Sequence, residues 1–288
     1  MKFTFVLPKE TPSQTVKELL EEEWLIPRKV KHFLRTRKNV TVNGDIAMFH
    51  QEVKALDTVT LTFEESDYEQ PTIHLGHAQL VEPIWEDEHL LIVNKPAGMK
   101  THPNQPDETD TLLNHVAAYL EVHQQHPYVV HRLDKETSGA ILFAKNPVVL
   151  PILGRMLEKK EIHRLYEAQI EGRLSKEAMT IRKKIGRDRH DRRKRVVDER
   201  KGKKAITHVK AFKQLSGTTW VECRLDTGRT HQIRVHLASI GKPIIGDPLY
   251  HPKDSQGKRL QLHAKELTLV HPFSKETILA KGMPYLSE

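Results

Sequence analysis

Two short apolar runs enclose a polar loop near the middle of the chain, and this pattern limits the possible folds more than any other feature. The runs cover residues 128–130 and 140–144, and the loop between them ends in the turn-forming residues Thr137, Ser138 and Gly139. Similar strand-like runs, separated by helical patterns, recur at residues 90–93, 162–170, 220–225 and 260–270. Strands dominate and helices lie between them, so the sequence predicts a mixed α+β fold.

One carboxylate, that of Asp134, lies where the first apolar run meets the loop, two residues after Arg132. Functional side chains are often carried on a loop between rigid strands. A structural interpretation is equally open, in which Asp134 closes an Asx-type turn and Arg132 is its surface salt-bridge partner. The loop alone is compatible with a catalyst and with a turn residue.

Residues 1–66 have the pattern of a small separate module. Thr15 to Glu18 has the form of a capping box, which predicts that a helix begins there. Pro27 suits the first turn of a second helix, which carries apolar residues on one face. Another face of this helix is basic and is expected to contact RNA phosphates through Arg28, Lys31 and Arg35.

A strand over residues 40–42 then runs into an Asn43-Gly44 turn, and alternation over residues 59–63 predicts a further strand. Two short helices, one of them basic, followed by this turn resemble the small RNA-binding module first recognised in a small-subunit ribosomal protein. Asn39 stands where that module usually has glycine. An unrelated α+β appendage is the alternative. A polar linker that contains Pro71 is expected over residues 67–79.

The positive charge of the chain is concentrated in residues 182–204, here called the basic arm. This segment holds 13 Lys or Arg and 4 Asp or Glu, a net charge of +9, whereas the whole chain carries +8. A focused basic segment is typical of a surface that binds a polyanion, nucleic acid above all, although a solvated charge run is the alternative. Its turn-forming residues favour a hairpin. Four consecutive cations, the tip cluster, are expected to contact RNA: Arg192, Arg193, Lys194 and Arg195.

The larger domain is expected over residues 80–288. Helices are predicted over residues 111–120 and from Asn146-Pro147 to about Leu157. Thr230 is expected to cap a further short helix.

Several protein classes lack support in the sequence. No run of 18 apolar residues occurs, and the first residues become polar too soon for a secretory signal. Cys223 is the only cysteine, which excludes a disulfide within the chain and a cysteine-based zinc site. His231 and His236 miss the i, i+4 spacing of helical zinc ligands, and no nucleotide-cofactor or G-x-S-x-G motif is found. We therefore expect a cytoplasmic protein without metal or cofactor, and take a monomer as the default.

A lone acid, several arginines, a tyrosine on a strand and a segment suited to a polyanion remain, and together they are compatible with chemistry on a nucleoside. A carboxylate can attack a sugar carbon as a nucleophile, and the base of a nucleoside is attached to such a carbon. A nearby guanidinium would keep Asp134 ionised, and Arg234 is a candidate for that role. A base in folded RNA must be flipped out and stacked on an aromatic ring, which Tyr166 can supply.

These residues belong to a longer series of motifs in the order of a known family. The chain closely resembles the pseudouridine synthases of the RluA type in residues 92–98, 131–139, 164–166, 227–236 and 246–247. Arg164 stands where that family most often has lysine, which keeps the charge but changes the hydrogen-bonding geometry.

The resemblance implies an isomerase that needs neither cofactor nor metal. Such an enzyme breaks the bond between uracil N1 and ribose C1′, turns the base and rejoins it through C5. The implied fold is a mixed, mostly antiparallel sheet with a central catalytic cleft. Asp134 would attack the sugar or the base, Tyr166 would stack on the uracil, and Arg234 would pair with Asp134. Further RNA contacts are implied for His131, Arg132, Arg229 and Leu262.

Large-subunit ribosomal RNA is the expected substrate, because an N-terminal RNA-binding module joined to this catalytic domain is common among enzymes that act on it. Three alternatives stay open. They are a synthase that acts on transfer RNA, a non-catalytic RNA-binding or ribosome-assembly protein that kept the fold, and a uracil-removing glycosylase.

Overall fold

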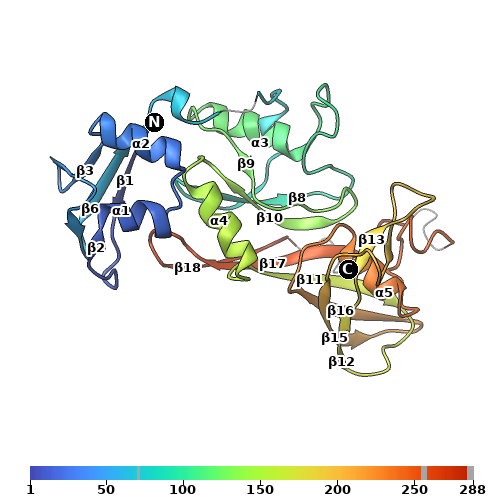
Figure 1. Cartoon of the computed structure of the whole chain (residues 1–288). Helices are drawn as coiled ribbons and strands as arrows, with labels where there is room; N and C mark the ends of the chain where they lie inside the picture. Colours follow the sequence, from blue (N-terminus) through green and yellow to red (C-terminus); the bar gives the residue numbers. More distant parts are fainter. Residues whose placement is uncertain (70–71, 254–257, 284–288) are drawn as a thin grey trace.

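The computed structural model describes residues 1–69, 72–253 and 258–283. The N-terminal elements lie at one end of the molecule, and helix α5 (Gln232–Ala238) lies at the other end (Figure 1). Pro71 of the predicted linker falls outside the described residues. Among the described residues, no helix has both the length and the apolar character needed to cross a membrane.

The N-terminal part combines a four-stranded sheet, in the order β1-β6-β3-β4, with short helices. Its elements are β1 (Lys2–Val6), β2 (Gln14–Thr15), α1 (Val16–Glu18), a π-helical turn (Leu19–Glu23), α2 (Arg28–Thr36), β3 (Val40–Val42), β4 (Asp45–Ile46), β5 (Glu52–Val53) and β6 (Thr58–Thr62).

Two local sequence motifs of this part adopt the structures that they predicted. Thr15 and Glu18 make both hydrogen bonds of the capping box at the start of α1. Asn43 and Gly44 have φ values of 53° and 93°, which two-residue hairpins of type I′ require, and they join β3 to β4. Strand β1 was not predicted; it pairs with β6 and buries Phe3 and Phe5.

The N-terminal part packs directly on the larger sheet. The ring centroids of Phe5 and Phe273 are 4.4 Å apart, and His89 stacks on Phe5 at 5.3 Å. The Arg155 guanidinium also donates hydrogen bonds to the backbone carbonyls of Glu22 and Glu23. One hydrophobic core therefore extends through both parts. The division of the chain at residues 66 and 80 stays a prediction.

The remaining elements form one large sheet with helices on its faces and a separate two-stranded hairpin. They are β7 (Pro83–Glu86), β8 (Leu90–Lys95), α3 (Leu112–Glu121), β9 (Tyr128–Val129), β10 (Ser138–Ala144), α4 (Val149–Glu158), β11 (His163–Glu171), β12 (Ala178–Arg182), β13 (Ile185–Arg187), β14 (Arg195–Val197), β15 (Ile206–Gln214), β16 (Thr218–Leu225), α5, β17 (Leu262–Val270) and β18 (Thr277–Lys281). Strands β12, β15 and β18 were missed by sequence reasoning, because they lack a long apolar run.

The large sheet has the order β12-β15-β16-β11-β17-β10-β8-β7, with β18 on β17 and β9 on β10. Among the described residues its strands pair antiparallel, except that β10 and β17 are parallel at Ser138–Gly139 and His263–Ala264. The predicted mixed, mostly antiparallel α+β fold is confirmed. Two antiparallel halves meet at this parallel pair, directly after the loop that carries Asp134.

Strands β8 and β10 are buried on both faces, as their continuous apolar runs indicate. Leu91 and Val93 share a core with the buried face of α3. Leu90 and Ile92 face the opposite core, which contains α4 and the N-terminal part. The predicted helices α3 and α4 are confirmed. The Asn146 carboxamide oxygen accepts backbone hydrogen bonds at the start of α4.

Candidate active site

The loop between β9 and β10 is held on both sides of Asp134. Before it, the Thr101 hydroxyl donates to the Leu133 carbonyl at 2.8 Å and accepts the Leu133 N–H at 3.2 Å. After it, the Lys135 carbonyl accepts from the Gly98 N–H at 2.9 Å and from the Lys95 ammonium at 3.0 Å. The segment that follows β8 therefore fixes the backbone around Asp134.

Lys95 is fully buried and donates to three carbonyl oxygens, those of Pro96, Met99 and Lys135. Burial lowers its pKa to about 7, while the charges of Asp134 and Glu136 act in the opposite direction. Sequence reasoning did not single out Lys95. Its position at the end of the apolar run 90–93 could have indicated a functional lysine, because a lysine is buried only when it has partners.

Gly139 ends the loop in a conformation that other residues avoid. Its φ is +111°, and a Cβ atom there would lie 2.2 Å from the Ala264 carbonyl oxygen. The parallel contact of β10 with β17 therefore depends on this glycine.

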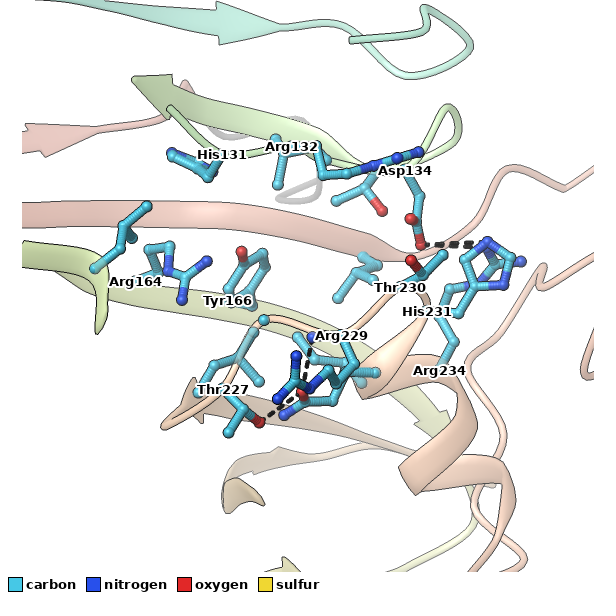
Figure 2. Close-up of a pocket in the computed structure, with 18 of the residues that line it drawn as sticks. His131, Arg132, Asp134, Arg164, Tyr166, Thr227, Arg229, Thr230, His231 and Arg234 are labelled. Atoms are coloured by element: carbon cyan, nitrogen blue, oxygen red, sulfur yellow. Dashed lines mark hydrogen bonds and ion pairs between the residues drawn. The ribbon is translucent and has the colours of Figure 1, made fainter. Parts of the chain in front are cut away.

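The Asp134 carboxylate faces two partners from α5 and the residue before it. Its Oδ2 lies 3.3 Å from Nη1 of Arg234 and 3.8 Å from Nε2 of His231 (Figure 2). Its side chain keeps 16 % of its surface exposed. Arg132 makes no ion pair with Asp134, although both residues are described, so the surface salt-bridge interpretation is wrong.

Arg234 has a stronger partner that sequence reasoning did not assign. Its Nε and Nη2 donate to the two carboxylate oxygens of Asp247 at 2.8 Å each, and the side chains of Arg234 and Asp247 are 3 % and 0 % exposed. Burial opposes ionisation of Asp247, but the hydrogen bonds and the charge of Arg234 outweigh it and lower the Asp247 pKa. Arg234 is thus held in place by Asp247 and presents its remaining nitrogen to Asp134.

Thr230 does not cap α5, so this prediction is wrong. His231 occupies the N-cap position with φ 58° and ψ 20° in the left-handed region, and α5 has no side-chain cap. This conformation turns the imidazole toward Asp134. Histidine is among the non-glycine residues that are enriched in the left-handed region.

Tyr166 comes from β11, on the opposite side of the site from Asp134 (Figure 2). Leu165 pairs with Glu266 but Tyr166 pairs with Ala264, so Lys265 of β17 is an extra residue. Bulges of this kind redirect side chains and occur often beside active sites. Tyr166 is 5 % exposed, and burial raises the pKa of its phenol, which is therefore neutral at pH 7.

A cleft of about 580 Å³, here called the tyrosine cleft, brings the predicted catalytic residues together. Its lining includes all three, Asp134, Tyr166 and Arg234, and four of the predicted RNA contacts: His131, Arg132, Arg229 and Leu262. Arg164, one of the residues in the motif series, also lines the cleft beside Tyr166 (Figure 2). The volume suits a small molecule or a single nucleoside.

The predicted RNA contacts in the tyrosine cleft differ in accessibility. Arg132 and Arg229 are exposed. Leu262 is 3 % exposed on the cleft wall, where a base could pack against it. His131 is buried, its Nε2 accepts the Leu142 N–H at 3.2 Å, and burial lowers its pKa to about 3. The His131 ring therefore supports β10, and its contact with RNA stays a prediction.

The basic arm forms a hairpin of β13 and β14, as its turn residues predicted. Its tip reaches the far side of Asp134. There a second depression of about 820 Å³, the arm hollow, is lined by Asp134, Arg132, Arg193 and Lys194 among others. Nε and Nη2 of Arg193 also donate to the two carboxylate oxygens of Asp191, at 3.0 and 2.8 Å.

The cations of α2 lie apart from this site, toward the other end of the molecule (Figure 1). Arg28 and Arg35 are exposed, and Arg35 borders a depression with Lys17 and Lys38. Lys31 is bound to Glu21 at 2.6 Å. If α2 contacts RNA, it does so away from Asp134.

Among the described residues, no group of three or more His, Cys, Asp or Glu side chains is placed to hold a metal ion. The tyrosine cleft brings together the Asp134 carboxylate, the guanidinium groups of Arg132, Arg164, Arg229 and Arg234, and the aromatic ring of Tyr166. Such a combination suits the binding of a nucleoside that is turned out of folded RNA.

Comparisons with known proteins identify the class. Residues 89–239 match the family model of RNA pseudouridylate synthase, and residues 3–59 match the RluD ribosomal pseudouridine synthase N-terminal domain. The chain belongs to the RNA pseudouridine synthase family and is an isomerase that acts on RNA.

Two relatives and one solved structure illustrate the similarity. An uncharacterised RNA pseudouridine synthase of Bacillus subtilis (strain 168), YhcT, is 41 % identical over 86 % of this chain and 82 % of its own length. Ribosomal large subunit pseudouridine synthase D of Neisseria meningitidis serogroup B is 40 % identical over 68 % of this chain and 56 % of its own. Human RNA Pseudouridylate Synthase Domain Containing 1 shares the fold, with a TM-score of 0.60 and 23 % identity over 74 % of this chain and 86 % of its own.

Proposed function

We propose that Asp134 is the essential carboxylate of a synthase that isomerises uridines in large-subunit ribosomal RNA. The observation that supports this role best is the position of Asp134. It is a partly exposed carboxylate on a tightly held loop, 3.3 Å from a buried arginine and at the edge of a nucleoside-sized cleft.

The proposed roles follow from the surroundings of each group. A flipped-out uridine enters the tyrosine cleft and stacks on Tyr166, with Leu262 against the base. Arg234, 3.3 Å from the carboxylate, holds Asp134 oriented toward the ribose. Asp134 then acts at the bond between N1 and C1′, by an ester at C1′ or by assisting an elimination, and the base rejoins through C5. Arg132, at the rim of the cleft, holds the flipped state.

Ribosomal RNA is favoured over transfer RNA by the similarity to proteins named ribosomal large subunit pseudouridine synthase D and by the N-terminal match. We also propose that the enzyme is a cytoplasmic monomer and that the basic arm and α2 extend the RNA contact. The comparison of pseudouridine maps from wild-type and deletion strains, read by carbodiimide adducts and primer extension, tests the substrate. A missing pseudouridine in transfer RNA alone would refute the ribosomal assignment.

Asp134→Asn tests the catalytic role. We expect no tritium release from RNA labelled at uracil C5, with RNA binding retained, because only the charge of one carboxylate is lost. Glu136→Gln is the matched control, since it neutralises the next carboxylate of the same loop, and it should retain most activity. Tritium release by Asp134→Asn would contradict the proposal, and free uracil from the wild type would indicate a glycosylase.

A further inference from the structure

Two hydrogen bonds connect the basic arm with His231, whose ring lies beside the Asp134 carboxylate. The backbone N–H of Arg195, in β14, donates to the hydroxyl of Tyr250 at 2.9 Å. The Tyr250 hydroxyl lies 2.9 Å from Nδ1 of His231. Nε2 of His231, on the other side of the ring, lies 3.8 Å from Oδ2 of Asp134.

The direction of these hydrogen bonds follows from the donors available. A backbone N–H can only donate, so the Tyr250 oxygen accepts from Arg195 and its single hydrogen is left for His231. Burial lowers the pKa of His231, against the opposing effect of Asp134, so the ring is neutral near pH 7. A neutral imidazole that accepts at Nδ1 carries its proton on Nε2, which faces the carboxylate.

Tyr250 is held from several sides. Its ring centroid lies 5.2 Å from Cζ of Arg234, and its backbone N–H donates to Asp247 at 3.0 Å. The rings of Tyr250 and His231 meet edge to face, with centroids 5.8 Å apart. The hydroxyl therefore links the basic arm to His231, beside Asp134.

We propose that His231 and Tyr250 are positioning residues that couple the docking of RNA on the basic arm to the orientation of Asp134. This inference rests on the proposed role of Asp134. The distance of 3.8 Å between Nε2 and Oδ2 exceeds a hydrogen bond. A movement of roughly 1 Å closes it, and RNA that pulls β14 inward acts on His231 through Tyr250. The carboxylate then gains a second directed donor beside Arg234.

Tyr250→Phe tests the link, because it removes only the hydroxyl and keeps the ring against Arg234. With saturating RNA we expect kcat to fall about tenfold, the effect of one lost hydrogen bond, while KM changes less than about twofold. Tyr119→Phe is the matched control, since it removes an exposed hydroxyl that is bonded to Glu86 and is absent from the lining of both depressions. An unchanged kcat in Tyr250→Phe would refute the link.

Two substitutions of His231 separate positioning from a structural role. The Gln amide nitrogen corresponds to Nε2 and can still donate to Asp134, whereas the Asn amide nitrogen corresponds to Nδ1 and cannot reach it. Asn, however, suits the left-handed backbone at φ 58° better. Positioning predicts more activity in His231→Gln than in His231→Asn. The reverse order would refute it.

Coupling to the arm is tested by a double-mutant cycle. Glutamine at all four tip-cluster positions removes side-chain charge but keeps the Arg195 N–H. We expect this change to lower kcat in the wild type but to have little further effect in Tyr250→Phe. If the losses of kcat caused by the two changes multiply in the combined variant, the coupling is refuted. Asp134→Asn is measured in the same assay to separate the coupling from the proposed function. If the coupling is absent but Asp134→Asn is inactive, only the coupling is refuted and the proposed function still holds.

Discussion

Replacing Asp247 by asparagine removes one charge from a buried ion pair and leaves the side-chain volume nearly unchanged. The wild-type pair has two hydrogen bonds of 2.8 Å, and both side chains are almost fully buried. The carboxamide oxygen of the Asp247→Asn variant can still accept from the backbone N–H groups of Leu249 and Tyr250, which Asp247 holds at 2.9 and 3.0 Å. The variant therefore tests the charge of Asp247 and leaves the turn intact.

The expected loss of stability follows from the desolvation of Arg234. Breaking a buried pair by removing one partner costs about 3 to 5 kcal/mol, because an uncompensated charge stays buried. Arg234 keeps the contact with Asp134 at 3.3 Å and the ring of Tyr250. We therefore expect the lower end, about 3 kcal/mol, which lowers Tm by roughly 6 to 12 °C.

Thermal unfolding followed by circular dichroism measures this shift, and Asp191→Asn is its control. The fork of Arg193 on Asp191 has nearly the same geometry, with bonds of 3.0 and 2.8 Å, but the Arg193 side chain is 77 % exposed. Solvent screens such a pair, so Tm of Asp191→Asn should stay close to that of the wild type. Equal Tm values for the two variants would refute the argument that burial makes the contribution of the Arg234–Asp247 pair to stability large.

Three further changes test other parts of the molecule. Glutamine throughout the tip cluster should weaken RNA binding and reduce the slope of log K against log salt by about 2 to 3; an unchanged slope would exclude the arm as a phosphate clamp. Gly139→Ala should prevent accumulation of folded protein, because its Cβ would lie 2.2 Å from the Ala264 carbonyl, and a normal Tm would contradict this geometry. Burial lowers the pKa of His89 to about 4 in the folded state, from its ordinary value of 6.5. Between these values the unfolded chain binds the proton and the folded chain does not, so stability falls as the pH is lowered, by about 3 kcal/mol in all. Urea unfolding of His89→Leu should show a smaller dependence of stability on pH in that window, and an equal dependence would show that His89 does not contribute.

The N-terminal hairpin and the start of α1 follow from short stretches of sequence. Asn43-Gly44 forms its turn because the two residues adopt positive φ, and Thr15 caps α1 through a residue three positions away. Asp134 lies between two strands, as the apolar runs predicted. Such features depend on neighbours in the chain and can be deduced without the fold.

The partners of Asp134 depend on the fold. Arg234 is 100 residues away in sequence, and the sequence suggested it as a partner only through charge and a family resemblance. Asp247 was seen as part of a motif, but its hold on Arg234 was not predicted, because nothing local to either residue indicates the pairing. The bulge that redirects Tyr166 likewise arises from the register of two distant strands.

By itself, the sequence determined the class of fold, the loop that carries Asp134 and the charge of the basic arm. The tertiary structure decided which groups surround that carboxylate. The parallel pairing of β10 with β17 joins the two halves of the sheet at Gly139. That junction places the Asp134 loop between Tyr166 and α5. The tip of the arm, in its separate hairpin, lies on the other side of Asp134. Side-chain neighbours in a sheet are set by strand order and register rather than by sequence distance.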